Sequence, residues 1–157
     1  MIGFLETVRR LRKVLEERMK ITTKGQYSLK AMAVLAASEG QGPVSVTQLA
    51  AETDVSENYL EQLLPRLRQA GLIESIRGAQ GGYLLSRPSG EISVGDVLRA
   101  GEGDLIPVEC SLTSDKPCEK EGGCVIKYVW KRMMDSLNET VDGISLKELV
   151  NMKTETV

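Results

Sequence analysis

The 157-residue chain contains no histidine, and only 4% of its residues are aromatic. Without histidine it cannot build a serine–histidine or cysteine–histidine catalytic pair, a histidine-ligated zinc site or the usual near-neutral general base. No apolar run reaches the roughly 18 residues of a membrane-spanning helix, and the first residues lack the apolar core and cleavage site of a signal peptide. We therefore expect a soluble cytoplasmic protein that is not an enzyme.

Charge is balanced overall but unevenly distributed. Residues 1–90 carry 12 basic and 9 acidic side chains, whereas residues 91–157 carry 8 and 13. The first part suits a polyanionic partner better than the second. Such a charge balance arises by chance in many domains. Whether the first part binds nucleic acid must therefore be judged from the placement of its individual side chains.

Residues 1–18 have the pattern of a basic amphipathic helix. Such a helix packs on its own protein, on a membrane surface or on DNA. The codons for residues 16–18 can also spell a ribosome-binding sequence at a suitable distance from Met19. We expect translation to start naturally at Met19 and residues 1–18 to be a non-native extension.

Helical periodicity and capping residues predict three helices, over residues 22–38, 45–53 and 56–71, with a capping box between Ser45 and Gln48 at the start of the second. Two strand-like segments then flank the glycine-rich stretch 78–82. Two helices joined by a tight turn and followed by a glycine-tipped hairpin make a winged helix-turn-helix. We expect this module to bind DNA. The alternative is that it is a protein–protein interaction module.

The side chains expected to contact DNA come from the start of the first helix, the exposed face of the third helix and the hairpin. Hydroxyls, lysine and free helix N–H groups suit phosphates, and an arginine beside a glycine tip can enter a narrow minor groove. A groove-facing glutamate accepts only from donors such as the cytosine amino group. The set is Thr22, Lys24, Glu57, Asn58, Tyr59, Glu61, Gln62, Arg66, Arg77, Gly78 and Gln80.

Three cysteines, Cys110, Cys118 and Cys124, lie in a charged, loop-like segment with seven and then five residues between them. This setting disfavours core packing, and a single disulfide would leave one thiol over. Soft thiolates select an iron–sulfur cluster, zinc or copper(I). The spacing matches neither zinc ribbons nor ferredoxins, so iron–sulfur and zinc both remain open.

A long helix from Val125 to Val141 carries an apolar stripe that is larger than one small domain needs. We expect the stripe to form the seam of a symmetric homodimer, which suits a pseudo-palindromic operator; the alternative is that Trp130 packs within its own domain. The stripe consists of Ile126, Val129, Trp130, Met133 and Leu137. The expected fold class is mainly α with a small β-hairpin.

The expected domain organisation has four parts. They are the extension 1–18, the winged helix-turn-helix 19–100, the cysteine-containing loop 101–124, and the dimerisation helix with a short final helix, 125–150.

Four stretches together resemble the IscR-like iron–sulfur regulators of the Rrf2 superfamily: residues 19–27, residues 59–64, the hairpin 76–85 and the cysteine loop. The resemblance covers Met19 to about Val150. It implies a homodimeric repressor of cluster-assembly genes with a cluster, usually [2Fe-2S], on the three cysteines, and cluster-assembly proteins as donors. It also links Glu61 to operator discrimination by the apo and cluster-bound forms.

The sequence departs from that family at two points. Seven rather than five residues separate the first two cysteines, and Lys127 stands where the family has a histidine. The fourth ligand is thus open between a loop carboxylate (Asp115, Glu119 or Glu121), a side chain near Gln26 of the partner subunit and a small thiol. A nitric-oxide or redox sensor, a regulator of cysteine metabolism and a zinc-stabilised protein–protein module are the alternatives.

Overall fold

The computed structural model describes residues 21–105 and 124–155. Within these ranges the chain is mainly helical with one two-stranded antiparallel hairpin, as the sequence predicts. The elements are α2 (Thr23–Ala37), α3 (Val46–Thr53), α4 (Glu57–Gln69), β1 (Ile73–Ile76), β2 (Gly82–Leu85), the 3₁₀ helix η1 (Ser89–Glu91), α5 (Val94–Glu102), α6 (Val125–Asp142) and α7 (Leu146–Glu155). The expected extension 1–18 lies outside the described residues, as do Cys110 and Cys118.

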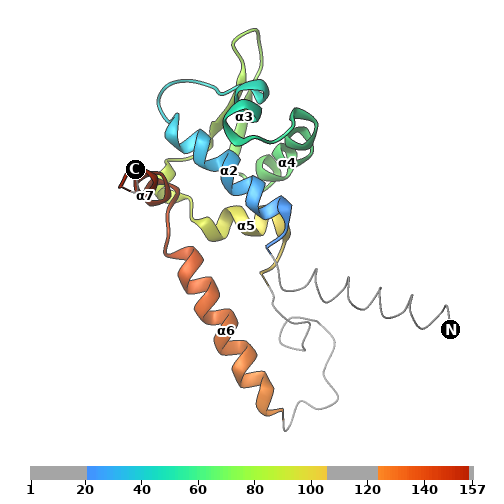
Figure 1. Cartoon of the computed structure of the whole chain (residues 1–157), viewed down its shortest axis with the longest axis vertical. Coiled ribbons are helices and arrows are strands. Elements are labelled where there is room, and N and C mark those ends of the chain that lie inside the picture. The colour runs from blue at the N-terminus through green and yellow to red at the C-terminus, as the bar shows by residue number, and fades with distance from the viewer. Residues whose placement is uncertain (1–20, 106–123, 156–157) are drawn as a thin grey trace, which may run out of the picture.

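Helices α2 to α5 and the hairpin gather in one body, and α6 projects from it (Figure 1). Helix α2 is central because it packs against α3, α4, α5 and α7. Its Met32 side chain is fully buried, as are Leu49 of α3 and Leu60 and Leu64 of α4. Each such side chain contributes about 1.5–3 kcal/mol when it leaves water. The core therefore holds α3 and α4 as a unit on α2.

Side-chain caps explain where the helices start. Ser93 accepts from the Asp96 N–H at 3.0 Å while the Asp96 carboxylate accepts from the Ser93 N–H at 3.1 Å, a complete capping box. The box expected at Ser45 is only half formed. Its hydroxyl accepts from the Gln48 N–H at 3.1 Å, but the Gln48 amide donates to Glu52 one turn later at 3.3 Å.

The hairpin is anchored on the helices by a third segment. Ile73 pairs with Leu85 and Ile76 with Gly82. Val44, just before α3, exchanges two backbone hydrogen bonds of 2.9 and 3.0 Å with Tyr83. A Cβ on Gly82 would collide with the Val44 carbonyl. Glycine is thus required here for the hairpin to lie against the start of α3.

A bidentate ion pair joins α5 to α6. The two terminal nitrogens of Arg99 each lie 2.8 Å from a carboxylate oxygen of Asp142, and Nη2 also lies 2.8 Å from Asn138 Oδ1. This geometry fixes direction as well as distance. The contacts of Arg99 with the last turn of α6 therefore orient this helix relative to α5. No helix in the described part of the chain is long and apolar enough to cross a membrane.

Candidate DNA-binding surface and cysteine site

The reading helix α4 has one buried and one exposed face, as the apolar spacing predicts. Leu60, Leu63, Leu64 and Leu67 are at most 2% exposed. The opposite face presents most of the side chains expected to contact DNA, namely Glu57, Asn58, Glu61, Gln62 and Arg66. Pro65 lies inside α4 without ending it. The polar face is therefore continuous over more than two turns.

Tyr59 differs from its neighbours on α4 because it is half-buried. Its ring meets the ring of Tyr27 on α2 edge to face, with centroids 5.4 Å apart and planes at 88°. Lys30 Nζ lies 5.4 Å from the Tyr27 ring centroid. The Tyr59 ring thus packs α4 on α2, a contact that the sequence did not predict, and the assignment of Tyr59 to DNA stays a prediction.

The hairpin tip is exposed and open. Arg77, Gly78 and Gln80 are all exposed, and the tip stands clear of the helices (Figure 1). Gly78 has a φ of 119° and no atom within 4 Å of where a Cβ would be. Glycine is needed for this backbone conformation, and the space around it leaves room for a DNA backbone.

The start of α2 holds a group that sequence reasoning missed. Thr22 Oγ1 accepts from the Lys24 N–H at 3.2 Å and lies 2.7 and 2.8 Å from the two carboxylate oxygens of Glu102. Glu102 also accepts from the Gly25 N–H at 2.9 Å. Its distance in sequence, 77 to 80 residues, explains why no local pattern pointed to it.

Basic side chains of the last turn of α4 are tied to other elements. Arg66 donates to the Gly101 carbonyl at 3.4 Å. Arg68, which the sequence analysis did not select, donates to Ser75 of β1 at 3.4 Å and is exposed. These two arginines add positive charge to the last turn of α4.

The structure describes one member of the cysteine triad. Cys124 is half-buried, forms no disulfide and stands at the N-cap of α6 without a side-chain capping bond. Within residues 21–105 and 124–155, no three potential metal ligands come together. The thiol of Cys124 is available as a metal or cluster ligand at the start of α6.

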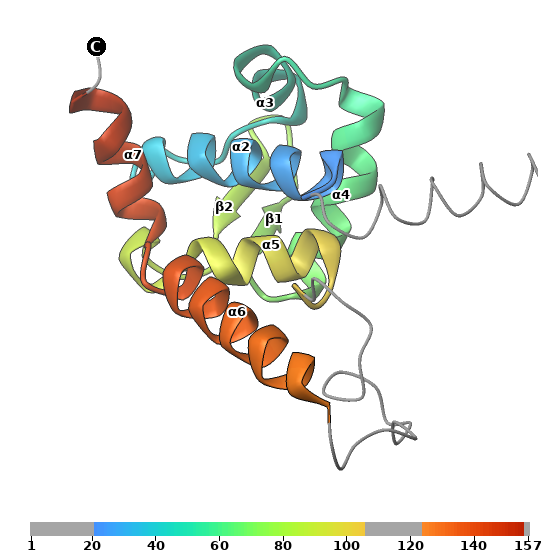
Figure 2. The ribbon, with the colours of Figure 1, turned by 60° about the horizontal axis from the view of Figure 1, so that its bottom comes forward.

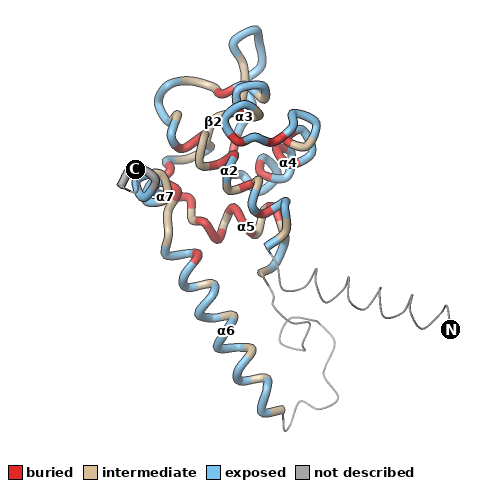
Figure 3. The backbone as a smooth tube through the Cα atoms, in the orientation of Figure 1, coloured by how far each residue is buried: buried red, intermediate tan, exposed pale blue. Residues whose placement is uncertain are grey.

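The apolar stripe of α6 lies largely in water in the single chain. Ile126 is 56% exposed, Val129 49%, Met133 44% and Leu137 39%, and Trp130 is half-buried. Figure 3 shows α6 mainly exposed beside the buried segments of α2 and α5. Tyr128, the other aromatic residue of this helix, is 66% exposed.

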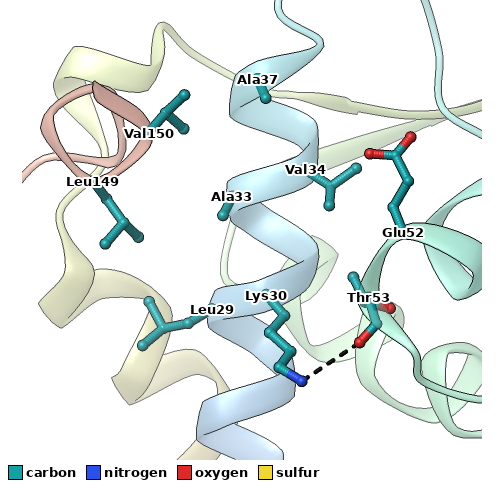
Figure 4. A pocket seen from close by; sticks show the side chains of 9 residues that line it. All are labelled: Leu29, Lys30, Ala33, Val34, Ala37, Glu52, Thr53, Leu149 and Val150. Carbon is teal, nitrogen blue, oxygen red and sulfur yellow. Dashed lines mark hydrogen bonds between the residues drawn. The ribbon is translucent and has the colours of Figure 1, made fainter. Parts of the chain in front are cut away.

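A pocket of about 470 Å³ lies between α2, α3 and α7 (Figure 4). Its polar side chains are those of Lys30, Glu52 and Thr53, and the Lys30 ammonium donates to the Thr53 carbonyl at 3.5 Å. The lining is Leu29, Lys30, Ala33, Val34, Ala37, Glu52, Thr53, Leu149 and Val150. Most of these side chains are apolar, so the pocket offers few groups that would orient a polar ligand.

Comparison with known proteins decides the family. Residues 21–152 match the family model Rrf2, described as an iron-dependent transcriptional regulator. The chain belongs to the Rrf2 family. As an Rrf2 protein it is a DNA-binding transcriptional regulator and not an enzyme, and its winged helix-turn-helix fold is confirmed.

The relatives of this Rrf2 protein include regulators with two different names. It is 42% identical over 133 residues to the regulator CymR of Bacillus subtilis, covering 85% of this chain and 91% of that one. It is 36% identical over 133 residues to the regulator IscR of Cronobacter sakazakii, covering 85% and 81%.

Solved structures of proteins with both names are similar to this chain. The B. subtilis CymR structure, titled the global cysteine regulator, matches with a TM-score of 0.70 at 41% identity, covering 85% and 98% of the two chains. The T. potens IscR structure matches with a TM-score of 0.70 at 40% identity, covering 88% and 90%. The expected superfamily is therefore confirmed. The comparisons do not assign this Rrf2 protein to either the CymR or the IscR group.

Proposed function

We propose that this Rrf2 protein is a cytoplasmic homodimeric repressor that senses an iron–sulfur cluster, with cluster biogenesis genes as its targets. The observation that carries the proposal is the set of three cysteines within 15 positions, of which Cys124 presents a free thiol at the start of α6. Cysteine thiolates are the ligands that iron–sulfur clusters most often use, and three of the usual four are present here. Cys110, Cys118 and Cys124 would hold the cluster, usually [2Fe-2S], and the fourth ligand would come from outside the triad.

Each surface has a role in this proposal. The exposed side chains of α4 read base edges in the major groove, with Glu61 rejecting bases that offer it no donor. Arg77 at the hairpin contacts phosphate or the minor groove. Cys110, Cys118 and Cys124 would hold a cluster whose charge and occupancy would change with redox state, iron supply or nitric oxide. Because Cys124 is the residue directly before α6, ligation of its thiol would act on the helix proposed to form the dimer.

The dimer is proposed from the exposed α6 stripe. Four large aliphatic side chains that remain 39–56% exposed are far more than a helix of a monomer needs to leave in water. Helix α6 also stands off the body, so a second copy can reach it (Figure 3). A two-fold dimer then presents two α4 helices to a pseudo-palindromic operator.

A second candidate, regulation of cysteine metabolism, is favoured by the 42% identity to CymR. That protein is named a global cysteine regulator. In this second candidate function, the thiols of the three cysteines would themselves react with the signal, and the protein would hold no cluster.

Anaerobic purification separates the two candidates. The proposal expects a brown protein with visible absorbance, iron and acid-labile sulfide in stoichiometric amounts, and loss of absorbance in each of Cys110→Ala, Cys118→Ala and Cys124→Ala. Circular dichroism of each variant controls for folding. A colourless wild-type protein without iron, after anaerobic reconstitution has also failed, would refute the cluster. Bound zinc would instead favour the protein–protein module.

A further inference from the structure

The last turn of α5 ends against the first turn of α2 (Figure 2). Gly101 is buried there, and a Cβ on it would lie 2.7 Å from Ser28 Oγ and 3.3 Å from the Lys24 carbonyl oxygen. The missing side chain is what allows the two helices to approach so closely. The next residue, Glu102, is thereby placed with its carboxylate at the N-terminus of α2.

That carboxylate is held as a bound anion would be. Thr22 Oγ1 lies 2.7 and 2.8 Å from its two oxygens, and the Gly25 N–H donates to it at 2.9 Å. A Cβ on Gly25 would stand 2.6 Å from Glu102 Oε1, so only glycine permits the approach. The unpaired N–H groups and positive dipole at the start of a helix favour an anion at this place.

The same donors are the ones that suit a DNA phosphate. One donor set cannot serve two anions, since a phosphate brought to this point would repel the carboxylate. We propose that Glu102 is a built-in competitor that occupies the N-terminus of α2 and lowers the affinity of the protein for DNA until a phosphate displaces it. This inference rests on the proposed use of Thr22 and Lys24 as phosphate contacts.

The position of Glu102 in the chain adds to its interest. It ends α5, and the chain continues from it directly into the segment that carries Cys110 and Cys118. The backbone of the same turn also engages the reading helix, because Gly101 accepts from Arg66 at 3.4 Å.

Charge removal at position 102 tests the competition. Glu102→Gln keeps the size of the side chain and an acceptor for Gly25, but removes the charge. We expect it to bind a random-sequence duplex of about 30 base pairs roughly three- to tenfold more tightly at about 100 mM salt, with the slope of log K against log salt steeper by about 1. Fluorescence anisotropy measures both quantities.

Glu91→Gln is the matched control, since it removes the same charge from an exposed residue of η1. We expect its salt slope to equal that of the wild type. A Glu102→Gln protein whose affinity for the duplex is unchanged or weaker would overturn the proposal. If Glu102 only caps α2, the substitution weakens the cap and gives no gain in DNA affinity.

The wild-type protein provides a second measurement that does not depend on how the variant folds. On addition of the duplex, the amide resonances of Gly25 and of Gly78 at the hairpin tip should both shift. Movement of Gly78 alone would refute the competition while leaving DNA binding intact. If wild-type protein gives neither shift nor anisotropy change, the proposed DNA-binding surface itself fails.

Discussion

The α6 stripe makes a quantitative prediction about assembly. Met133→Glu and Leu137→Glu place charge on side chains that are 44% and 39% exposed in the single chain. Complete burial of such a side chain is worth about 1.5–3 kcal/mol, so covering the exposed part contributes about 1 kcal/mol. In a symmetric dimer each substitution occurs twice and removes about 2 kcal/mol. The dissociation constant should rise roughly 30-fold for one substitution and roughly 1,000-fold for both.

Sedimentation velocity across a concentration series measures this directly. The wild type should sediment as a dimer, and the double variant as a monomer at micromolar concentration. DNA affinity should fall with it, because a monomer contacts one half-site.

Lys131→Glu provides the control, since it also changes the net charge by two but lies on the other side of α6. Its ion pair with Asp135, at 2.8 Å, is exposed, and such i,i+4 pairs contribute only about 0.3–0.5 kcal/mol. This variant should remain dimeric. A double variant that dimerises as tightly as the wild type would refute the assignment of the stripe to the seam.

Three further outcomes are expected. Arg77→Ala should cost about 1–3 kcal/mol in binding to a selected duplex and relax its specificity if Arg77 reads bases, or chiefly lower the salt slope if it holds phosphate; an unchanged isotherm would contradict both. Glu61→Ala should let the apo protein gain affinity for the operator preferred by the cluster-bound form, and an undiminished gap would make Glu61 a solvated charge. Arg99 lowers the pKa of Asp142, so Asp142→Asn should unfold at lower urea than wild type at pH 7. That difference should shrink below pH about 4, as the folded-state carboxyl protonates; a constant difference would exclude the ion pair.

Local patterns predicted the elements well because their causes are local. Caps such as Ser56, whose hydroxyl accepts from the Tyr59 N–H at 3.3 Å, and the left-handed turn at Asp54, with φ of 57°, are encoded within four residues. The apolar spacing of α4 likewise fixed which face is buried.

Contacts between distant segments were not predictable in this way. Glu102 reaches Thr22 across 80 residues, and Arg99 reaches Asp142 across 43. Charged residues at helix ends carry no periodic signal that names their partners. The edge-to-face contact between Tyr59 and Tyr27 joins α4 to α2 in the same way, and no local pattern points from one ring to the other.

The central claim is that the occupancy of the three cysteines controls DNA binding, and paired isotherms test it most directly. A duplex selected in vitro by the anaerobic brown protein is titrated under argon with that protein and with the same preparation after the metal has been removed by chelation. The account predicts that the two dissociation constants differ by at least about tenfold, or about 1.4 kcal/mol, and that the Cys110→Ala/Cys118→Ala/Cys124→Ala variant follows the chelated protein. Superimposable isotherms from a protein that demonstrably carries and loses its cluster would contradict it.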